Sequence, residues 1–413
     1  MNSKGYEKKL YIILNHGIGN IGGGQLYVNS KREFLERLDW TVRIYSCQGD
    51  NIMVEGLKAH QKYVMDEIKV LPMYLRKSVR EKTLCKMAEG VDQFQKIVIE
   101  SNSVWLSVWG EMLAARIGAK HIVYNLNETP ICPPELYEFF KFKLDRLEIA
   151  GIKLQSVPFF FKPYLDVKED EKYHLTAHYV KKQVEDVPCN IVETIKPADF
   201  TIGVIGRLAK PYVIKTVQGI IEFATKYPEK KINVIYIGGD DKGGHVEEQL
   251  TTAYKDVKNI TIYLAGYLYP MPLSLLKILD LVITNAGAAW ATSREGILTI
   301  TIDPNDCMPI GVLGVTTNEV LFRGDEKSCP LPEMLNDILV NCLYSKEQIN
   351  VPIANNDIME LLQHHMDFVN SSAKTCEYYT DFIIPSLWKK CIISVFGYKA
   401  YIKIYKMLKH SNS

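Results

Sequence analysis

Three cationic side chains, Arg207, Lys210 and Lys215, follow an apolar run at residues 201–205. The run is short and β-branched, which is typical of a buried strand in a parallel sheet. Pro211 suits the first turn of a helix, where its missing N–H leaves no hydrogen bond unmade. The end of a strand beside a helix N-terminus is where open α/β sheets bind anions. We therefore interpret this stretch as a phosphate or diphosphate site; the alternative is that the cations only solvate a surface loop.

Glycines and small polar residues follow the expected strands of the second half of the chain. Strands are expected at residues 233–237, 260–264, 281–284 and 298–302, with helices between them. Because the carboxyl ends of parallel strands meet at one edge of a sheet, the residues after them are expected to line one crevice. The residues concerned are Gly206, Gly238, Gly266, Tyr267, Asn285, Ala286, Gly287 and Asp303.

A second candidate site opens the chain, where a glycine-rich loop follows the expected strand at residues 10–14. The loop contains Gly17, Gly19 and Gly22, which spell the G-x-G-x-x-G pattern of nicotinamide-dinucleotide sites. That pattern requires a helix that begins inside the glycine run and an acid at the end of the second strand. Here further glycines are expected to precede the helix, and the second strand at 41–46 is followed by Cys-Gln. We therefore rank an NAD-dependent oxidoreductase below a loop that receives an acceptor substrate, and a flexible connection stays open.

The acceptor hypothesis assigns Gly22, Gly23, Gly24 and Gln25 to acceptor binding, because glycines allow a ligand to lie against the backbone. His16 lies in the same loop, at the end of the first strand. A histidine at this position can exchange a proton with a substrate, so it is a candidate catalytic residue. A structural role for the ring is the equal alternative.

Two acids of the first half are candidates for proton transfer or acceptor binding. Glu128 follows the expected strand at 121–126, at the edge where ligands bind, and is a candidate catalytic base. Glu111 lies in the expected helix at 104–117 and is a candidate for acceptor binding. The alternatives are a loop cap for Glu128 and an acid on the helix surface for Glu111.

Bulk composition limits the class of protein. The 413 residues are enough for two domains, and 47% hydrophobic content supplies two cores. The net charge of +1 gives the whole chain no general attraction for nucleic acid. Nine scattered cysteines form no Cys-x-x-Cys pair, which indicates reduced thiols rather than a disulfide framework or a zinc site. The N-terminal apolar run is too short for a signal peptide, so a cytoplasmic location is expected.

The remaining segments complete the expected organisation. Residues 55–95 and 162–185 are expected to be helical, 154–161 to form a strand, and 186–199 to connect two domains. Helices at 331–343 and 356–369 are expected to close the second domain. The domains are therefore placed at 1–190 and 191–370, followed by C-terminal helices at 371–413.

The C-terminal end combines positive charge with aromatic residues. From Trp388 onward the chain has six lysines and no acid, with tyrosines and a phenylalanine between them. This composition suits peripheral contact with an anionic membrane, where each lysine contributes about 1 kcal/mol. The alternative is a helix packed on the first domain with solvated lysines. Nucleic acid is not favoured by the rest of the chain.

Four short motifs of the second half resemble a known family. They are GRL followed by lysine, YIGGD, IYLAGYL and LDLVITNAG, and the first half adds GGGQLY. Together they are similar to the GT-B glycosyltransferases, most of all to the large retaining family that builds bacterial polysaccharides. The resemblance implies an α/β fold of two Rossmann-like, doubly wound domains that face a cleft. It also implies a nucleotide-sugar donor bound by the second domain.

The resemblance assigns roles residue by residue. Arg207 and a following lysine match the pair that clamps the donor diphosphate, although the family's usual lysine position holds Tyr212 here. Lys210 and Lys215 lie on either side of that position, and the sequence leaves the choice open. The nucleotide loop matches Gly266 and Tyr267.

The family's two donor-site glutamates have no clear counterpart. Glu295, with Asp303 eight positions later, could imitate the pair and makes Glu295 a catalytic candidate. In the register set by the strand at 281–284, however, the sugar-facing loop is Asn285 to Gly287, which holds no glutamate. The acid that would hold the ribose therefore stays open.

The function implied is transfer of a sugar from a UDP- or GDP-type donor to a saccharide or lipid-linked acceptor at the inner face of a membrane. No cofactor and no metal are expected, because cations and helix dipoles can neutralise the diphosphate. Asp240 with Asp241, or Asp303 with Asp306, could suggest a metal pair but are interpreted as turn caps. A non-catalytic nucleotide-sugar-binding partner stays open as the alternative.

Overall fold

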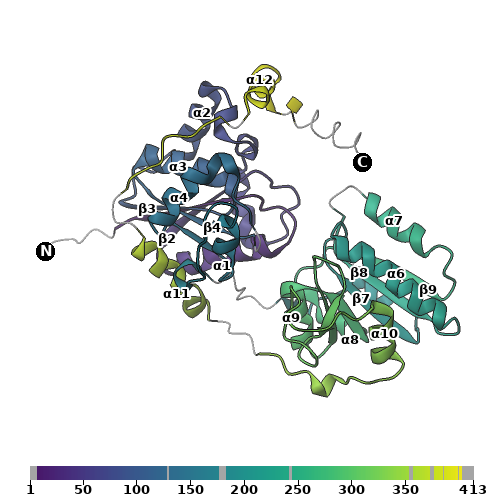
Figure 1. Cartoon of the computed structure of the whole chain (residues 1–413). Coiled ribbons are helices and arrows are strands. Elements are labelled where there is room, and N and C mark those ends of the chain that lie inside the picture. The colour runs from purple at the N-terminus through teal and green to yellow at the C-terminus, as the bar shows by residue number, and fades with distance from the viewer. Residues whose placement is uncertain are drawn as a thin grey trace. The chain divides into compact units, whose positions relative to one another are not determined.

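The computed structural model describes residues 7–127, 130–175, 183–240, 244–352, 357–372, 376–384, 386–398 and 400–401. The chain divides into two compact units, which we call the first unit (residues 1–180 and 355–413) and the second unit (residues 181–354) (Figure 1). The expected boundaries at 190 and 370 both lie too late in the chain. The return to the first unit begins near residue 355, so it includes a helix that was expected to close the second domain.

The first unit is built on a five-stranded parallel sheet of order β2-β1-β3-β4-β5. Its strands are β1 (Lys9–Asn15), β2 (Trp40–Ser46), β3 (Lys96–Ser101), β4 (Lys120–Asn125) and β5 (Ile149–Gly151). Its helices are α1 (Gly23–Arg37), α2 (Lys77–Met87), α3 (Val104–Ile117), α4 (Tyr137–Asp145) and α5 (Ser156–Phe161). The strand order reverses between β1 and β3, so their carboxyl ends form the switch point at which such sheets bind ligands.

Helix α3 shows how local sequence defines the elements of this unit. The Ser103 hydroxyl accepts a hydrogen bond from the Leu106 N–H at 3.4 Å and caps the N-terminus. Gly118 ends the helix in the left-handed conformation, with φ of 69°. The helix contains Trp109, whose Nε1 donates to the carbonyl of Val70 at 2.9 Å inside the core. The expected helix at 104–117 is confirmed.

Other expected elements of the first unit are wrong. Residues 55–74 form three 3₁₀ segments, Glu55–Tyr63, Asp66–Lys69 and Pro72–Tyr74, and only α2 is a regular helix in the 55–95 region. The apolar run at 154–161 ends in helix α5 rather than forming a strand. Pro158 lacks the N–H that a central strand needs, and the aromatic side chains that follow it pack into the core from a helix.

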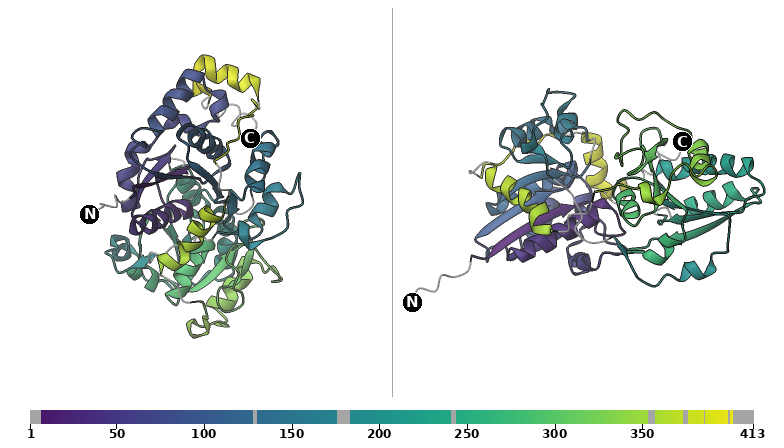
Figure 2. Two further views of the ribbon diagram at one scale, coloured as in Figure 1. Left: turned by 90° about the vertical axis from the view of Figure 1, so that its left-hand side faces the viewer. Right: turned by 90° about the horizontal axis from the view of Figure 1, so that it is seen from below.

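The second unit is built on a six-stranded sheet of order β13-β12-β11-β7-β8-β9, in which only β13 runs antiparallel to its neighbour. Its strands are β7 (Phe200–Ile205), β8 (Ile232–Ile237), β9 (Ile260–Gly266), β11 (Leu281–Thr284), β12 (Leu298–Ile302) and β13 (Pro309–Val312). Its helices are α6 (Pro211–Lys226), α7 (His245–Tyr254), α8 (Leu273–Lys277), α9 (Ala286–Arg294) and α10 (Leu331–Leu339). Helices lie on both faces of this sheet (Figures 1 and 2). The expected alternation of strand and helix is confirmed.

A short parallel pair of β6 (Val184–Glu185) and β10 (Met271–Pro272) joins the start of the second unit to its body. Val184 lies in the same apolar cluster as Ile205 and Ile237 of the main sheet. The segment expected to be an interdomain connection at 186–199 therefore belongs to the second unit.

Two C-terminal helices, α11 (Ile358–Ser371) and α12 (Leu387–Phe396), belong to the first unit. Helix α11 packs on α1, and the Lys120 ammonium donates to the carbonyl of Val369 at 2.7 Å. Helix α12 is held by Arg76, whose Nε donates to the carbonyl of Ser394 at 2.6 Å (Figure 1). None of the helices in the described parts of the chain is long and apolar enough to cross a membrane. The nine cysteines are free thiols.

Candidate functional site

The strand order of the second sheet reverses between β7 and β11, and the loops after these strands form its switch point. The loop after β7 carries Arg207 and Lys210, while β11 is followed by Asn285. The Lys210 Nζ donates to Oδ1 of Asn285 at 3.4 Å, so the two loops meet across the switch point. Arg207 is exposed and Lys210 is half-buried. The place where open α/β sheets bind ligands therefore carries two cations.

Tyr212 supports the loop after β7. Its hydroxyl donates to the carbonyl of Ile205 at 2.7 Å, and the Thr284 hydroxyl donates to the same oxygen at 2.8 Å. Burial raises the pKa of Tyr212 well above its usual value, so the phenol stays neutral. A side chain at Gly206 would overlap with the Tyr212 hydroxyl, which explains the glycine. Tyr212 therefore braces the loop, while Lys210 supplies the charge that faces the neighbouring strand.

Two further loops join the same edge of the sheet. The Gly238 N–H donates to the carbonyl of Gly266 at 2.8 Å, and the Leu208 N–H donates to the carbonyl of Gly239 at 3.1 Å. A side chain at Gly239 would overlap with the ring of Tyr267, so that ring lies directly against the glycine backbone. The structure thus brings these glycines and Tyr267 together with the loop that carries Arg207.

The N-terminus of α9 lies at the same carboxyl edge of the second sheet. Asn285 is buried and extended, Ala286 adopts a positive φ of 53°, and Gly287 follows in the first turn. The Ala286 N–H donates to the carbonyl of Val320 at 2.7 Å, which ties a later loop to this helix end. That loop contains Glu319, an exposed acid that sequence reasoning did not single out. The polar run at 316–319 after a strand was the available signal.

Lys215 and Asp303 lie near the β12–β13 loop. Burial raises the pKa of Cys307 in that loop, and the nearby charge of Lys215 opposes the shift. The Asp303 carboxylate accepts from the backbone N–H groups of Asn305 at 2.8 Å and Arg323 at 2.9 Å. Asp303 therefore uses both oxygens to hold its own loop, which is the role of a turn cap.

Glu295 does not belong to this edge. It follows the last residue of α9, which runs back from the carboxyl end of β11 toward the start of β12. Leu298 at the start of β12 pairs with Leu281 at the start of β11, so Glu295 lies at the amino edge of the sheet. The catalytic assignment of Glu295 is wrong because the helix carries it away from the switch point.

In the first unit, His16 follows β1 at the carboxyl edge and is partly exposed. Partial burial, together with the charge of Lys69, lowers the pKa of His16 below its usual value. Its ring Nδ1 lies 3.5 Å from the Cys47 Sγ, and burial raises the pKa of that thiol to about 11. Burial and the charge of Lys69 therefore both favour the neutral ring, which can accept a proton.

The glycine loop after β1 is partly filled by its own chain. The Ile18 N–H donates to the carbonyl of Gln48 at 2.8 Å, and a side chain at Gly19 would overlap with the backbone of Asp50. The Gln25 Nε2 donates to the carbonyls of Gly17 and Gly19 at 3.1 and 3.2 Å. The structure thus uses Gln25 as a brace of the loop and not as a free acceptor ligand.

The start of α1 also differs from expectation. The helix begins at Gly23, with Gly22 as its N-cap, so it does open within the glycine run. A side chain at Gly22 or Gly24 would meet no backbone of another segment. The first turn of α1 therefore remains accessible to a ligand, in contrast to the loop before it.

Glu111 lies in the core. Its Oε2 is 2.7 Å from His121 Nδ1 and 2.5 Å from Lys143 Nζ, and its Oε1 accepts from the Tyr379 N–H at 2.8 Å. Burial alone would raise its pKa, but the His121 hydrogen bond and the Lys143 charge hold the pKa of Glu111 down to about 2. The assignment of Glu111 to acceptor binding is corrected, because the carboxylate is fully buried and paired.

Ser101 extends this network into a line that resembles a hydrolase triad. Its Oγ lies 3.0 Å from the Nε2 of His121, whose other nitrogen faces Glu111. Burial, with the charge of Lys143, lowers the pKa of His121 to about 4. All members are buried, so no substrate can reach the hydroxyl, and the network serves to hold β3, β4, α3 and α4 together. Glu128, the other acid proposed for this half, lies outside the described residues.

The described residues contain no group of three or more metal-ligating side chains. The acids that could suggest a metal pair have other partners. Asp240 Oδ2 accepts from the Val246 N–H at 2.6 Å, and Asp306 forms an ion pair with Arg323 at 2.7 Å. Asp241 lies outside the described residues.

Solved structures resemble this chain over most of its length. A glycosyltransferase from Rickettsia africae covers 89% of this chain and 95% of its own, with a TM-score of 0.56 and 14% identity. MnaA of S. aureus, solved with UDP, covers 90% and 100%, with a TM-score of 0.51 and 10% identity. A candidate UDP-N-acetylglucosamine 2-epimerase from Listeria monocytogenes covers 91% and 100%, with a TM-score of 0.51 and 11% identity.

The chain has a GT-B fold. This confirms the architecture implied by the short motifs. At such low identity the likeness concerns the fold and leaves the reaction to be argued from the site. No protein-family model matches the chain, and no curated protein matches it in sequence.

Proposed function

We propose that this protein is a glycosyltransferase that transfers a sugar from a UDP- or GDP-type nucleotide sugar to a saccharide acceptor. The observation that carries the proposal is the meeting of Lys210 and Asn285 across the switch point of the second sheet, beside exposed Arg207. A nucleoside diphosphate is the anion that a GT-B chain would place at such a point.

The donor diphosphate is proposed to lie on Arg207 and Lys210, next to the N-termini of α6 and α9. When the sugar departs, negative charge grows on the diphosphate, and fixed cations stabilise that charge without reorganising. The Tyr267 ring, which lies against Gly239, offers a flat surface for the nucleoside. Lys210 is preferred to Lys215 as the partner of Arg207 because Lys210 donates to Asn285 in the loop after β11, and no hydrogen bond from Lys215 to that loop is found among the described residues.

The acceptor is proposed to bind the first unit at the start of α1, where Gly23 is exposed and Gly22 and Gly24 are half-buried, with no side chain of their own over the backbone. His16 is the candidate that accepts the proton of the acceptor hydroxyl, because its lowered pKa keeps the ring neutral. By family analogy the transfer would retain the anomeric configuration.

Contact with an anionic membrane is proposed for the C-terminal end, which would place a lipid-linked acceptor and the protein at the inner face of a cell membrane. In α12, Trp388 is 55% exposed and Phe396 is 67% exposed, while Lys389 and Lys390 follow the tryptophan. Apolar and cationic side chains on one short helix suit the headgroup region. Ile393 is buried, so the helix also has a structural anchor.

Vesicle sedimentation tests the membrane contact. The full chain is expected to sediment with vesicles that contain phosphatidylserine and not with phosphatidylcholine alone, and added salt should release it. Deletion of 388–413 should abolish sedimentation. Sedimentation that is unchanged by the deletion would show that this segment is not the contact.

Nucleotide binding tests the donor site. UDP or GDP at 100 times its Kd should stabilise the protein by about 2.7 kcal/mol in a thermal melt. Arg207→Ala and Lys210→Ala should remove most of that shift, while Lys226→Ala, at the far end of α6, should retain it. A melt that responds to NAD and to no nucleoside diphosphate would refute the proposal.

Two other activities predict different products from a bound nucleotide sugar. A 2-epimerase, which the Listeria neighbour brings into consideration, would change the sugar without releasing free UDP during turnover. A non-catalytic partner would bind UDP and leave the nucleotide sugar intact. Acceptor-dependent release of UDP, followed by chromatography, separates transfer from both.

A further inference from the structure

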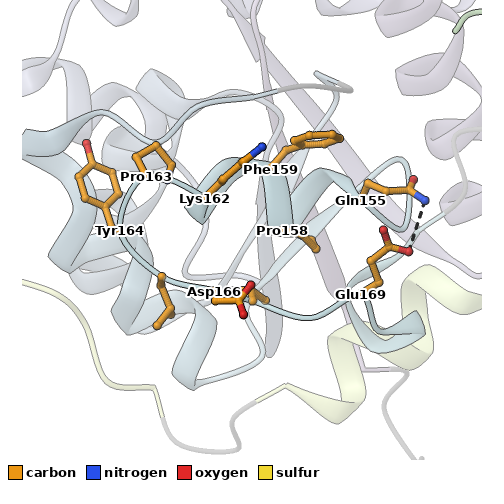
Figure 3. A pocket seen from close by; sticks show the side chains of 10 residues that line it. Gln155, Pro158, Phe159, Lys162, Pro163, Tyr164, Asp166 and Glu169 are labelled. Atoms are coloured by element: carbon orange, nitrogen blue, oxygen red, sulfur yellow. Dashed lines mark hydrogen bonds between the residues drawn. The ribbon is translucent and has the colours of Figure 1, made fainter.

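A cavity of about 460 Å³ lies on the outer side of α5 in the first unit (Figure 3). Gln155, Pro158, Phe159 and Lys162 recur at helical spacing, so they form the face of α5 that points away from the core. The chain then turns back, and residues 163–169 form the opposite wall. The volume lies within the range of roughly 300–1,000 Å³ that is usual for ligand sites.

Contacts on both sides of the cavity tie its walls to each other and to the unit. The Gln155 Nε2 donates to Oε2 of Glu169 at 3.4 Å, which joins the start of the helix to the returning chain (Figure 3). On the other side, the Tyr164 hydroxyl donates to the carbonyl of Cys132 at 3.3 Å, and its ring lies 4.8 Å from that of Tyr137. These contacts hold both walls in place, so the cavity is built into the fold.

Its lining combines flat apolar surfaces with separated polar groups. Phe159 and Tyr164 are 43% and 39% exposed, which is unusual for side chains that could pack in a core. Lys162 and Asp166 lie on opposite sides of the cavity, and neither forms an ion pair with any residue in the described part of the chain (Figure 3). The Lys162 ammonium lies 5.9 Å from the centre of the Phe159 ring, so the cavity presents a cation beside an aromatic ring and a carboxylate on the returning chain.

The balance of charge selects the class of ligand. Lys162 is opposed by Asp166 and Glu169, so the lining has no surplus of positive charge to attract a phosphate or a nucleotide. A long acyl chain is also disfavoured, because three charged groups and an amide would lose water without a partner. A pyranose ring suits the lining: its C–H faces pack on aromatic rings, and its hydroxyls bond to carboxylates, amides and ammonium groups.

We infer that the α5 cavity binds one sugar unit of a neutral or amino-bearing saccharide, as a holding site for the acceptor chain on the first unit. The inference rests on the proposed transferase function for the role of that saccharide, but the binding itself does not require the donor site. Phe159 supplies the stacking surface, and Asp166 and Lys162 bond to hydroxyls on opposite edges of the ring.

The test uses the full chain on an array of defined mono- to hexasaccharides, followed by saturation-transfer NMR with each saccharide that binds. Phe159→Ala and Asp166→Asn are expected to weaken binding about tenfold each, as loss of an aromatic contact or a charged hydrogen bond does. The matched controls are Phe396→Ala and Asp92→Asn, which remove exposed side chains of the same types elsewhere in the first unit. Both replaced residues of the cavity are exposed, so the variants should keep the melting temperature of the parent.

Three results would overturn the inference. They are the absence of binding to every saccharide at millimolar concentration, equal binding by the cavity variants and their controls, and displacement of the saccharide by UDP alone. UDP binding is measured on the same proteins. It shows whether the donor site works, and so separates failure of the saccharide site from failure of the proposed function. If cavity variants lose the saccharide yet still bind UDP, the inference stands independently of the donor site.

Discussion

Each of the two units has its own sheet, in which parallel strands form a switch point, but the units place their charged side chains differently. In the first unit, Lys31 and Glu100 lie 3.8 Å apart in the core, and Glu111 and Lys143 form a second buried pair. In the described part of the second unit, Asp303 is the only buried charged residue, and the cations near the switch point are exposed or half-buried.

The difference separates structural charge from ligand-binding charge. Burial of a charge is costly unless other groups compensate for it. The Tyr11 and Tyr27 hydroxyls each donate to Glu100 at 2.7 Å, while the Lys31 ammonium, which has no hydrogen-bond partner among the described residues, lies over the Tyr11 ring at 5.3 Å. A cation at the edge of a sheet keeps its capacity for a ligand. The same residue types therefore hold the first unit together and equip the second unit to bind an anion.

The largest effect is expected from breaking the buried network of the first unit. Glu111→Ala leaves Lys143 and His121 without their carboxylate, and removal of one partner of a buried pair costs about 3–5 kcal/mol. Denaturant unfolding followed by tryptophan fluorescence reports chiefly on this unit, which holds Trp40, Trp105, Trp109 and Trp388. Exposed Glu138→Ala is the control, and a loss as small as the control's would mean that the network contributes nothing.

Acid should weaken the first unit through its buried histidines. Burial lowers the pKa values of His60 and His121 to about 4, so below pH 6.5 the unfolded chain takes up protons that the folded chain does not. Stability should therefore fall from pH 6.5 toward pH 4, on the order of 3 kcal/mol for His121. Below pH 4.5 the lowered pKa of Glu111 adds a further loss in the same direction.

The measurement is the denaturation midpoint at several pH values, with His121→Gln as the comparison. The variant should show a shallower decline, since the contribution of His121 is removed while those of His60 and His16 remain. A midpoint that is constant from pH 7 to pH 5 would contradict the buried neutral histidines.

The switch point of the second unit offers a sharper distinction between two cations. Lys210→Ala should weaken UDP binding by about 1.5–3 kcal/mol, the usual contribution of a charged hydrogen bond, and Lys215→Ala should have a smaller effect. Isothermal titration calorimetry with UDP gives both values. If Lys215→Ala loses more UDP affinity than Lys210→Ala, the diphosphate lies closer to the β12–β13 loop than proposed.

Two glycines of the first unit should respond in opposite directions. Gly19→Ala forces the Asp50 backbone to move and should destabilise by about 1–3 kcal/mol. Gly24 lies in α1, where an added methyl meets only Leu126 at 3.8 Å, so Gly24→Ala should stabilise by up to about 1 kcal/mol. The melting temperatures of the two variants, compared with that of the parent, test these opposite expectations. If Gly24→Ala is stable but loses activity, the start of α1 contacts the acceptor.

Much of the framework follows from local pattern. The apolar β-branched runs at 201–205 and 281–284 predict β7 and β11, because side chains of this kind suit a strand buried on both faces. Pro211 marks the start of α6 within one residue of the cationic loop. The position of Arg207 at a sheet edge could thus be predicted before the tertiary structure was known.

Other features depended on partners distant in the chain. The sequence pattern suggests that the acid at 111 is a surface residue of a helix. Its burial beside Lys143 and His121 is seen only in the tertiary structure. The pattern at 154–161 predicts a strand, but the segment ends in a helix whose phenylalanines pack into the core. The spacing of Glu295 suggests a donor-site acid, and only the direction of α9 shows that it lies away from the site.

The sequence by itself determined the alternation of strands and helices, the glycine-rich turns and the cations that follow β7, because propensity, periodicity and turn chemistry act over a few residues. The tertiary structure decided which charges are buried, which lysine meets Asn285, how the chain returns to the first unit and where the α5 cavity lies. These properties arise from contacts between segments far apart in the chain, whose partners no local pattern identifies.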